Sequence, residues 1–235
     1  MKKRIGILTG GGDCPGLNAV IRAVIKSARQ RGWDTIGFMA GFEGLLEPMQ
    51  YRTLEYNEMD GLLHVGGTIL GSTNRGRFAA KTGHGEVQQV PFEILDEAKK
   101  NFESLGLRAL ICVGGDGSLT IAQQLFERGV PIVGVPKTID NDLEATQMTF
   151  GFDSAVACAT DALDRLRTTA QSHDRVMVLE VMGRYAGWIA VHSGIAGGGD
   201  VILIPEIPFS YDSVCTKIAQ REVRGKHFTL VVVAE

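Results

Sequence analysis

The chain has 235 residues and a mass of 25.3 kDa, and 44% of its residues are hydrophobic, so it can bury a sizeable core and form two lobes. Its formal net charge of −3 and its pI near 6.0 argue against nucleic acid or an acidic membrane surface as the main partner. We expect a reduced, cytoplasmic protein, because the sequence shows no membrane span or signal peptide and its four cysteines form no Cys-x-x-Cys.

Predicted strands and helices alternate along the chain. A strand at 4–8 is followed by a helix at about 17–31, in which apolar residues recur at the 3, 4, 7, 8 spacing of one buried helical face. After a short strand near 35–39 and a less regular stretch to about 90, the expected elements are helix 92–104, strand 108–113, helix 119–128, strand 130–135, helix 153–171, strand 175–181, a helix near 186–194, strand 200–204, helix 211–223 and strand 227–234. Such alternation implies right-handed crossovers and mostly parallel sheets. We therefore predict an α/β protein with two doubly wound, Rossmann-like lobes.

We place the boundary between the two lobes near Phe150, so that residues 1–150 form the first lobe and residues 151–235 the second. The last predicted strand is fully apolar and stops one residue before Glu235, where a doubly wound unit would continue into a loop and a covering helix. We therefore expect the second lobe and the return to the first lobe to be truncated at residue 235, and the chain to be a fragment.

Glycine-rich loops follow two of the predicted strands. The first is Gly10–Gly16, and the second is Gly114–Ser118, which leads into a helix. Backbone N–H groups of such loops, together with a helix N-terminus, can hold an anion, and glycine permits its close approach. We expect Ser118 to be the N-cap residue of the helix and Asp116 to meet a cation carried by a phosphate. The chain contains no P-loop pattern, and its first turn lacks the dinucleotide fingerprint.

The segment Pro136–Asp142 follows another apolar run and contains two carboxylates two residues apart. In open α/β sheets, ligands bind at the carboxyl ends of the strands. Like charges held this close are costly unless a positive group, or a group about to lose a proton, lies between them. A metal with phosphate, or an acceptor hydroxyl, would meet that need. A surface turn is the alternative, since Asp and Asn are common turn residues, but the glycine loops favour a ligand site.

Four segments resemble the signatures of the phosphofructokinase family, in the order and approximate spacing of that family: Gly11–Gly16, Gly114–Ser118, Lys137–Asp142 and Glu180–Arg184. The second segment alone would also fit lipid or NAD kinases, whereas the last two would not. The resemblance covers effectively the whole chain. It implies a 6-phosphofructokinase of glycolysis, which transfers the γ-phosphoryl group of ATP, with Mg²⁺, to the 1-hydroxyl of fructose 6-phosphate and forms fructose 1,6-bisphosphate.

The resemblance also implies roles for individual residues. Asp140 is expected to be the general base that accepts the proton of the sugar hydroxyl. The expected catalytic residues are Asp140, Thr138, Asp142 and Arg184. The residues expected to bind the donor in the first lobe are Gly11, Gly12, Arg75, Gly114, Gly115, Asp116, Gly117, Ser118 and Lys137, with Asp116 linked to Mg²⁺. The residues expected to bind the sugar phosphate, mostly in the second lobe, are Thr138, Asp140, Asp142, Arg175, Met182, Gly183, Arg184 and Glu235.

Two of these arginines involve further choices. In many relatives the arginine that binds the transferred phosphoryl group lies a residue or two before the position of Arg75. Either Arg75 or Arg77 could take this role in the chain, and we prefer Arg75. Arg175 resembles an arginine that reaches the site of a neighbouring subunit, which implies a homo-oligomer, a dimer or a tetramer. The alternative for Arg175 and Arg184 is that each only solvates a loop or forms an ion pair with Asp174 or Glu180.

The phosphoryl donor depends on two positions that disagree. Glycine at position 117 leaves room for the α-phosphate of ATP, whereas pyrophosphate-using members carry aspartate there. Lysine at position 137 is the residue that pyrophosphate users carry, whereas many ATP-dependent members carry glycine there. The combination of Gly117 and Lys137 resembles an intermediate, mixed-substrate group that includes ATP-dependent members. We favour ATP, because a lysine can move aside while an added carboxylate keeps its charge. A pyrophosphate-dependent enzyme, a kinase of another sugar phosphate and a non-catalytic sensor of sugar phosphates or nucleotides are the alternatives.

Overall fold

The computed structural model describes residues 2–73, 76–78, 89–144 and 146–235. The chain forms two compact units, Met1–Lys137 and Thr138–Glu235, and each unit has its own sheet. The predicted lobe boundary near Phe150 divides the chain by the expected roles of its residues, and it stays a prediction. No helix in the described residues is long and apolar enough to cross a membrane.

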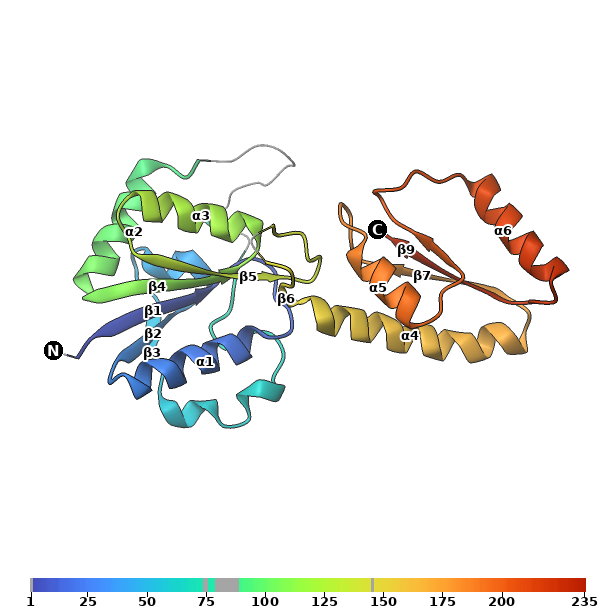
Figure 1. Cartoon of the computed structure of the whole chain (residues 1–235). Helices are drawn as coiled ribbons and strands as arrows, with labels where there is room; N and C mark the ends of the chain where they lie inside the picture. The colour runs from blue at the N-terminus through green and yellow to red at the C-terminus, as the bar shows by residue number, and fades with distance from the viewer. Residues whose placement is uncertain (1, 74–75, 79–88, 145) are drawn as a thin grey trace. The chain divides into compact units, whose positions relative to one another are not determined.

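The first unit is built around five strands of a six-stranded sheet, in the order β3-β2-β1-β4-β5, and β6 (Phe150–Gly151) follows β5 as the sixth strand (Figure 1). Its strands are β1 (Arg4–Thr9), β2 (Asp34–Phe38), β3 (Tyr51–Thr53), β4 (Leu107–Gly114) and β5 (Ile132–Thr138), the last residue of which begins the second unit. The pairs β1–β2, β1–β4 and β4–β5 are parallel, and the pair β2–β3 is antiparallel. The central strands are buried on both faces, as expected for a parallel sheet covered by helices.

Helices lie on both sides of this sheet, with α1 on one side and α2 and α3 on the other (Figure 1). They are α1 (Leu17–Gln30), α2 (Phe92–Ser104) and α3 (Asp116–Glu127), and three 3₁₀ turns, η1 (Gly41–Leu45), η2 (Tyr56–Met59) and η3 (Leu62–His64), lie in the less regular stretch. The spacing predicted for the first helix is confirmed, because Leu17, Ile21, Ile25 and Ala28 are all buried. The doubly wound arrangement expected from the sequence is therefore present in this unit.

The second unit contains a three-stranded parallel sheet with the order β7-β9-β8. Its elements are β6 (Phe150–Gly151), α4 (Phe152–Ser172), β7 (Val176–Val181), α5 (Trp188–Ala196), β8 (Val201–Leu203), α6 (Tyr211–Val223) and β9 (Thr229–Ala234). Leu163 of α4, Ala190 of α5 and Val232 of β9 form a buried cluster, so α4 and α5 pack against the same sheet. The α/β class predicted from the sequence is confirmed for both units.

Two predicted boundaries were wrong by about three residues, and both lie next to the predicted site. Helix α3 begins at Asp116, because the Leu119 N–H donates to the Gly115 carbonyl 2.9 Å away and closes the first turn earlier than expected. Strand β5 continues through Pro136, which pairs in register with Gly114, to Thr138. The loop with the two carboxylates therefore begins at residue 139.

Helix α6 buries none of its residues, so apolar packing does not explain its position. The Arg221 guanidinium instead forms an ion pair of 2.8 Å with Asp200 and donates hydrogen bonds to the Thr229 hydroxyl at 3.2 Å and the Phe228 carbonyl at 3.2 Å. Asp200 also accepts a 2.9 Å hydrogen bond from the Leu230 N–H. The side chains of Arg221 and Asp200 are only 19% and 17% exposed, so this pair is poorly screened by solvent.

We expect Arg221→Ala to destabilise the second unit by about 2–3 kcal/mol, because it leaves Asp200 largely buried without its cation. The midpoint of urea unfolding, followed by far-UV circular dichroism, measures this loss. Arg224→Ala, at the exposed end of the same helix, is the control and should change stability by less than about 0.5 kcal/mol. Equal midpoints for the two variants would show that this ion pair does not hold α6.

Candidate functional site

The carboxyl ends of β1, β4 and β5 lie along one edge of the first sheet, because these strands are parallel neighbours. The chain leaves β1 toward β2 on one side, while β4 lies on the other side of β1. This reversal is a topological switch point, where the connecting helices leave on opposite faces and open a crevice at the strand ends. Both predicted glycine loops begin at this crevice.

The two glycine loops pack against each other so closely that side chains would not fit. The Gly10 N–H donates to the Val113 carbonyl at 2.8 Å, which ties the first loop to β4. A Cβ atom at Gly10 would collide with the Ser118 hydroxyl, and one at Gly114 would lie 2.9 Å from that hydroxyl and closer still to the Ser118 Cβ. One at Gly115 would lie 3.2 Å from the Lys137 carbonyl. The close packing of the two loops therefore requires glycine at these positions.

Ser118 is not the N-cap residue of α3, and this prediction was wrong. Gly115 is the N-cap residue and makes no side-chain capping bond, while Ser118 lies inside the first turn and is buried. The first turn of α3 therefore has N–H groups with no capping side chain. A helix N-terminus of this kind favours an anionic ligand.

Lys137 brings a positive charge to the candidate site of the first unit, and it is only 5% exposed. Its ammonium donates a hydrogen bond of 2.5 Å to the Gly12 carbonyl, which links the end of β5 to the first glycine loop. The charge of Lys137 affects two nearby cysteines. Burial raises the pKa of the Cys112 thiol to about 12 and also raises the pKa of the Cys14 thiol, and the positive charge of Lys137 acts against both increases. Lys137 thus lies between the two loops and brings positive charge to their backbones.

The structure also shows two positioning residues that the sequence analysis did not select. The hydroxyl of Thr9, at the end of β1, contacts the Thr68 hydroxyl at 2.9 Å and donates to the Gly71 carbonyl at 2.9 Å. Buried Asn18 donates to the Val65 carbonyl at 2.8 Å and accepts from the Ile69 N–H at 2.9 Å. Together they hold segment 65–71 beside the edge. Thr9 is the last residue of β1 and Asn18 lies in the first turn of α1, and neither position carries a local sequence signal for this role.

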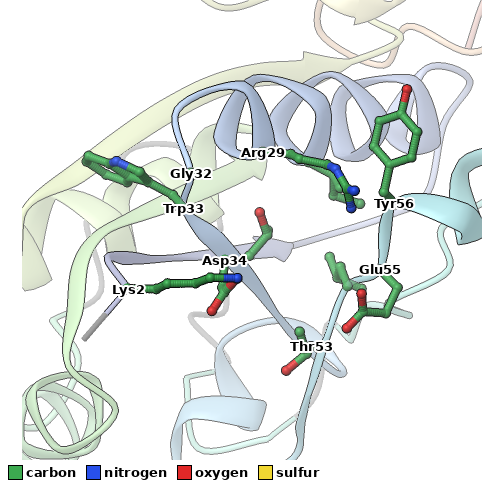
Figure 2. Close-up of a pocket in the computed structure, with 11 residues that line it drawn as sticks. Lys2, Arg29, Gly32, Trp33, Asp34, Thr53, Glu55 and Tyr56 are labelled. Carbon is green, nitrogen blue, oxygen red and sulfur yellow. The ribbon is translucent and has the colours of Figure 1, made fainter.

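A pocket of about 520 Å³ lies at the opposite edge of this sheet, near the amino ends of β1 and β2 (Figure 2). It is lined by charges of both signs, among them Lys2 and Arg29 opposite Asp34 and Glu55. None of the predicted site residues lines it. Its position and mixed charge separate it from the crevice at the carboxyl ends.

Asp116 is exposed and is the first residue of α3, next to the glycine loops. No group of three or more His, Cys, Asp or Glu side chains that could hold a metal occurs among the described residues. Mg²⁺ is commonly held by one or two carboxylates together with substrate phosphates and water. A single exposed carboxylate at an anion-binding helix terminus fits that mode of binding.

In the second unit, the carboxylate loop is closed by short polar contacts. The Asp140 N–H donates to the Thr138 hydroxyl at 3.1 Å, and the Thr149 hydroxyl donates to the Thr138 carbonyl at 2.6 Å. Ile139 and Val181, the last residue of β7, both pack against the buried cluster of Phe152, Ala159 and Ile189. The loop that carries Asp140 therefore lies beside the carboxyl end of β7.

Segment Met182–Arg184 and Glu235 lie at the same edge of the second sheet. Val181 of β7 pairs in register with Ala234 of β9, and the Glu235 N–H donates to the Val181 carbonyl at 2.9 Å. Gly183 has φ +137°, and a Cβ atom there would lie 2.5 Å from the Ala186 carbonyl, so the turn requires glycine. The exposed Arg184 guanidinium lies over the Tyr185 ring, 5.1 Å from its centroid.

Arg175 lies elsewhere, since it precedes the first residue of β7. A strand of this length separates Arg175 from the Met182–Arg184 segment by about 20 Å. Its side chain is exposed, and neither Arg175 nor Arg184 pairs with Asp174 or Glu180 in the described part of the chain. The structural ion pair considered for these two arginines is therefore not formed.

Arg75 lies outside the described residues. The alternative, Arg77, lies within 3.6 Å of Glu43 and 3.5 Å of Glu97 and donates to the Glu47 carbonyl at 3.1 Å. Its guanidinium is thus already surrounded by acceptors from the protein itself.

A doubly wound sheet with uncapped N–H groups, glycine backbone and a buried cation at its switch point defines an α/β phosphate-binding protein. The sequence profile described as Phosphofructokinase matches residues 4–235, so the chain belongs to the phosphofructokinase family. It is 57% identical over 234 residues to the ATP-dependent 6-phosphofructokinase of Chloroflexus aurantiacus, covering 100% of this chain and 65% of that protein. It is 51% identical to ATP-dependent 6-phosphofructokinase 2 of Clostridium perfringens, covering 99% of this chain and 64% of that protein.

Solved structures agree with this assignment. The phosphofructokinase of Saccharomyces cerevisiae superposes with a TM-score of 0.85 at 33% identity and covers 100% of this chain and 34% of that one. A pyrophosphate-dependent phosphofructokinase from Marinobacter aquaeolei gives a TM-score of 0.81 at 26% identity, over 99% of this chain and 60% of that one. The chain thus spans 64–65% of the length of these two curated relatives.

We expect Gly10→Ala to destabilise the first unit by about 1–3 kcal/mol, because the new Cβ atom collides with Ser118. Gly12→Ala is the matched control, since a Cβ atom there meets nothing within 4 Å. Thermal unfolding should show the difference. Ser118→Ala in the Gly10→Ala background should recover part of the loss, because the Ser118 hydroxyl is the nearest atom; no recovery would contradict this packing.

Proposed function

We propose that the protein carrying this chain is an ATP-dependent 6-phosphofructokinase, which transfers the γ-phosphoryl group of ATP to the 1-hydroxyl of fructose 6-phosphate. The observation that carries the proposal is 57% identity over the whole chain to a relative named ATP-dependent 6-phosphofructokinase. The reaction places the protein in glycolysis and in the cytoplasm. The domain assignment follows: residues 1–150 form the donor lobe, whose last loop also supplies Thr138, Asp140 and Asp142 to the acceptor, and residues 151–235 form the sugar-phosphate lobe.

The acceptor side depends on Asp140. Its carboxylate accepts the proton of the 1-hydroxyl while that oxygen forms a bond to the γ-phosphorus, the bond to the bridging oxygen breaks, and ADP leaves. The Thr138 hydroxyl accepts the Asp140 N–H bond and can still donate its own proton to a ligand oxygen. Asp142 completes the pocket, and Arg184, with Met182, Gly183 and Glu235 at the same edge, binds the sugar phosphate.

The donor side uses the first unit. The glycine backbone and the uncapped turn of α3 supply N–H groups for phosphate oxygens, and Lys137 supplies a fixed positive charge. The residues that we assign to donor binding are Gly11, Gly12, Arg75, Gly114, Gly115, Asp116, Gly117, Ser118 and Lys137. Asp116 would hold Mg²⁺ together with the phosphates, and the ion would neutralise charge on the transferred group. The contacts of Arg77 with three glutamates support Arg75 as the phosphoryl-binding arginine.

The choice of ATP over pyrophosphate rests on Gly117 and on the environment of Lys137. The lysine hydrogen-bonds to the Gly12 carbonyl, so it has a structural role that does not require pyrophosphate. A pyrophosphate-dependent reaction is the second candidate, because Lys137 is the residue found in pyrophosphate users. Coupled assays of the full-length protein with fructose 6-phosphate and either ATP or pyrophosphate decide between them. Turnover with pyrophosphate alone would reject ATP, and no turnover with either donor would favour a kinase of another sugar phosphate or a non-catalytic relative.

We also propose that the protein is a homo-oligomer in which Arg175 serves a neighbouring subunit. The observation that supports this proposal is that Arg175 is exposed, unpaired with acids among the described residues, and at the end of β7 away from Arg184.

We expect Asp140→Asn to lower kcat by roughly 10²–10⁴-fold, because the amide keeps the size and hydrogen bonding of the side chain but cannot accept the proton. The KM values for both substrates should change little. Glu144→Gln, which removes a carboxylate from the same loop, is the matched control and should retain kcat. Steady-state kinetics test this, and near-normal turnover of the Asp140 variant would remove it from the base role.

We expect Gly117→Asp to lower kcat/KM for ATP by roughly 10²–10³-fold, because the new carboxylate would repel the α-phosphate where solvent screens charges poorly. Any activity with pyrophosphate should survive, and the KM for fructose 6-phosphate should stay unchanged. Gly117→Ala adds volume without charge and should have a much smaller effect, which separates repulsion from crowding. Unchanged ATP kinetics in the aspartate variant would overturn the proposal that Gly117 determines the choice of phosphoryl donor.

A further inference from the structure

Asn141 has an unusual backbone conformation between the two carboxylates of the second unit. Its φ is +53°, in the left-handed region that asparagine enters more readily than most side chains. The turn at this residue separates Asp140 from Asp142, so the conformation of Asn141 decides how the two carboxylates are presented.

The side chain of Asn141 closes the loop that follows it. Its carbonyl oxygen accepts a 2.9 Å hydrogen bond from the Thr149 N–H, and its amide donates to the Gln147 carbonyl at 3.2 Å. The Thr149 hydroxyl donates to the Thr138 carbonyl at 2.6 Å. We call these four residues, Thr138, Asn141, Gln147 and Thr149, the Asn141 clamp. The clamp joins the end of β5 to both sides of the loop.

Packing gives this loop little support of its own. Loop residues and the side chains of Trp188 and His192 line an open cavity of about 490 Å³, and Met148 of the loop is 55% exposed. Thr149, in contrast, is only 3% exposed. Thr149 is therefore the buried anchor of the clamp, and its hydrogen bonds to Asn141 and Thr138 tie the loop to the end of β5.

We propose that Asn141 is a positioning residue for Asp140 and Asp142, acting through the clamp and through its left-handed backbone. This inference rests on the proposed function. An aspartate at position 141 could accept the Thr149 bond but could not donate to Gln147, and it would add a third negative charge. Asparagine is the residue that satisfies all three demands: positive φ, one acceptor and one donor.

Two variants separate the backbone from the clamp. Asn141→Gly keeps access to positive φ but removes both side-chain bonds, so any loss reports on the clamp. Thr149→Val removes the hydroxyl at nearly constant shape, and Thr149→Ser, which keeps the hydroxyl, is the matched control. We expect kcat to fall roughly 10- to 100-fold in the first two variants, because small displacements of a catalytic group slow the reaction strongly. The serine variant should stay within about twofold of wild type.

Three readouts distinguish positioning from general destabilisation. The KM values and the pH dependence of kcat should stay close to wild type, because the base itself is unchanged. The Asn141→Gly and Thr149→Val double variant should lose less than the product of the two single losses, since both break one clamp. Hydrogen–deuterium exchange should accelerate at the Thr149 amide in Asn141→Gly while the β7 and β9 amides keep their protection.

The outcomes separate the clamp from the proposed reaction. Full kcat in Asn141→Gly, or losses that simply multiply in the double variant, would overturn the positioning role. Unchanged exchange at Thr149 would overturn the clamp even in a protein that turns over no substrate. An inactive wild type whose Thr149 amide still exchanges faster after Asn141→Gly would reject the kinase reaction, and with it the positioning role, while leaving the clamp intact.

Discussion

The parallel pairing of β1, β4 and β5 is the constraint on which the site in the first unit depends. Parallel strands bring all their carboxyl ends to one edge, so the loops that follow three strands distant in sequence meet without any further device. The reversal of strand order beside β1 then leaves a crevice at that edge. The second unit repeats the principle with β7 and β9, whose ends carry Met182–Arg184 and Glu235.

Strand β5 spans the boundary between the two units, because its last two residues belong to different units. Lys137 ends the first unit and Thr138 begins the second, so a residue assigned to the donor is bonded directly to a residue assigned to the acceptor. A change in the conformation of the Lys137–Thr138 peptide would displace the glycine loop through the hydrogen bond to Gly12 and the carboxylate loop through the hydrogen bond to Thr138.

The sequence was sufficient for those parts of the site that depend on local chemistry. Glycine loops after apolar runs, and carboxylates after a strand, were predictable because strand ends and turns have local signals, and the α/β class followed from the alternation of elements. The start of α3 was misplaced, because a glycine without a side-chain cap leaves no signature, whereas Ser118 suggested one. Thr9, Asn18 and Thr149 were missed, because their partners lie between 8 and 62 residues away.

The burial of Lys137 gives the first glycine loop a property that exposed lysines do not provide. Folding has already removed water from this ammonium and fixed it against the Gly12 carbonyl. The desolvation of the charge therefore lowers the stability of the folded protein and does not weaken the binding of an anionic ligand. The ammonium has little freedom left to lose, so its contribution to recognition carries a small entropic cost. The affinity of the proposed anion site and the stability of the fold are consequently coupled through one side chain.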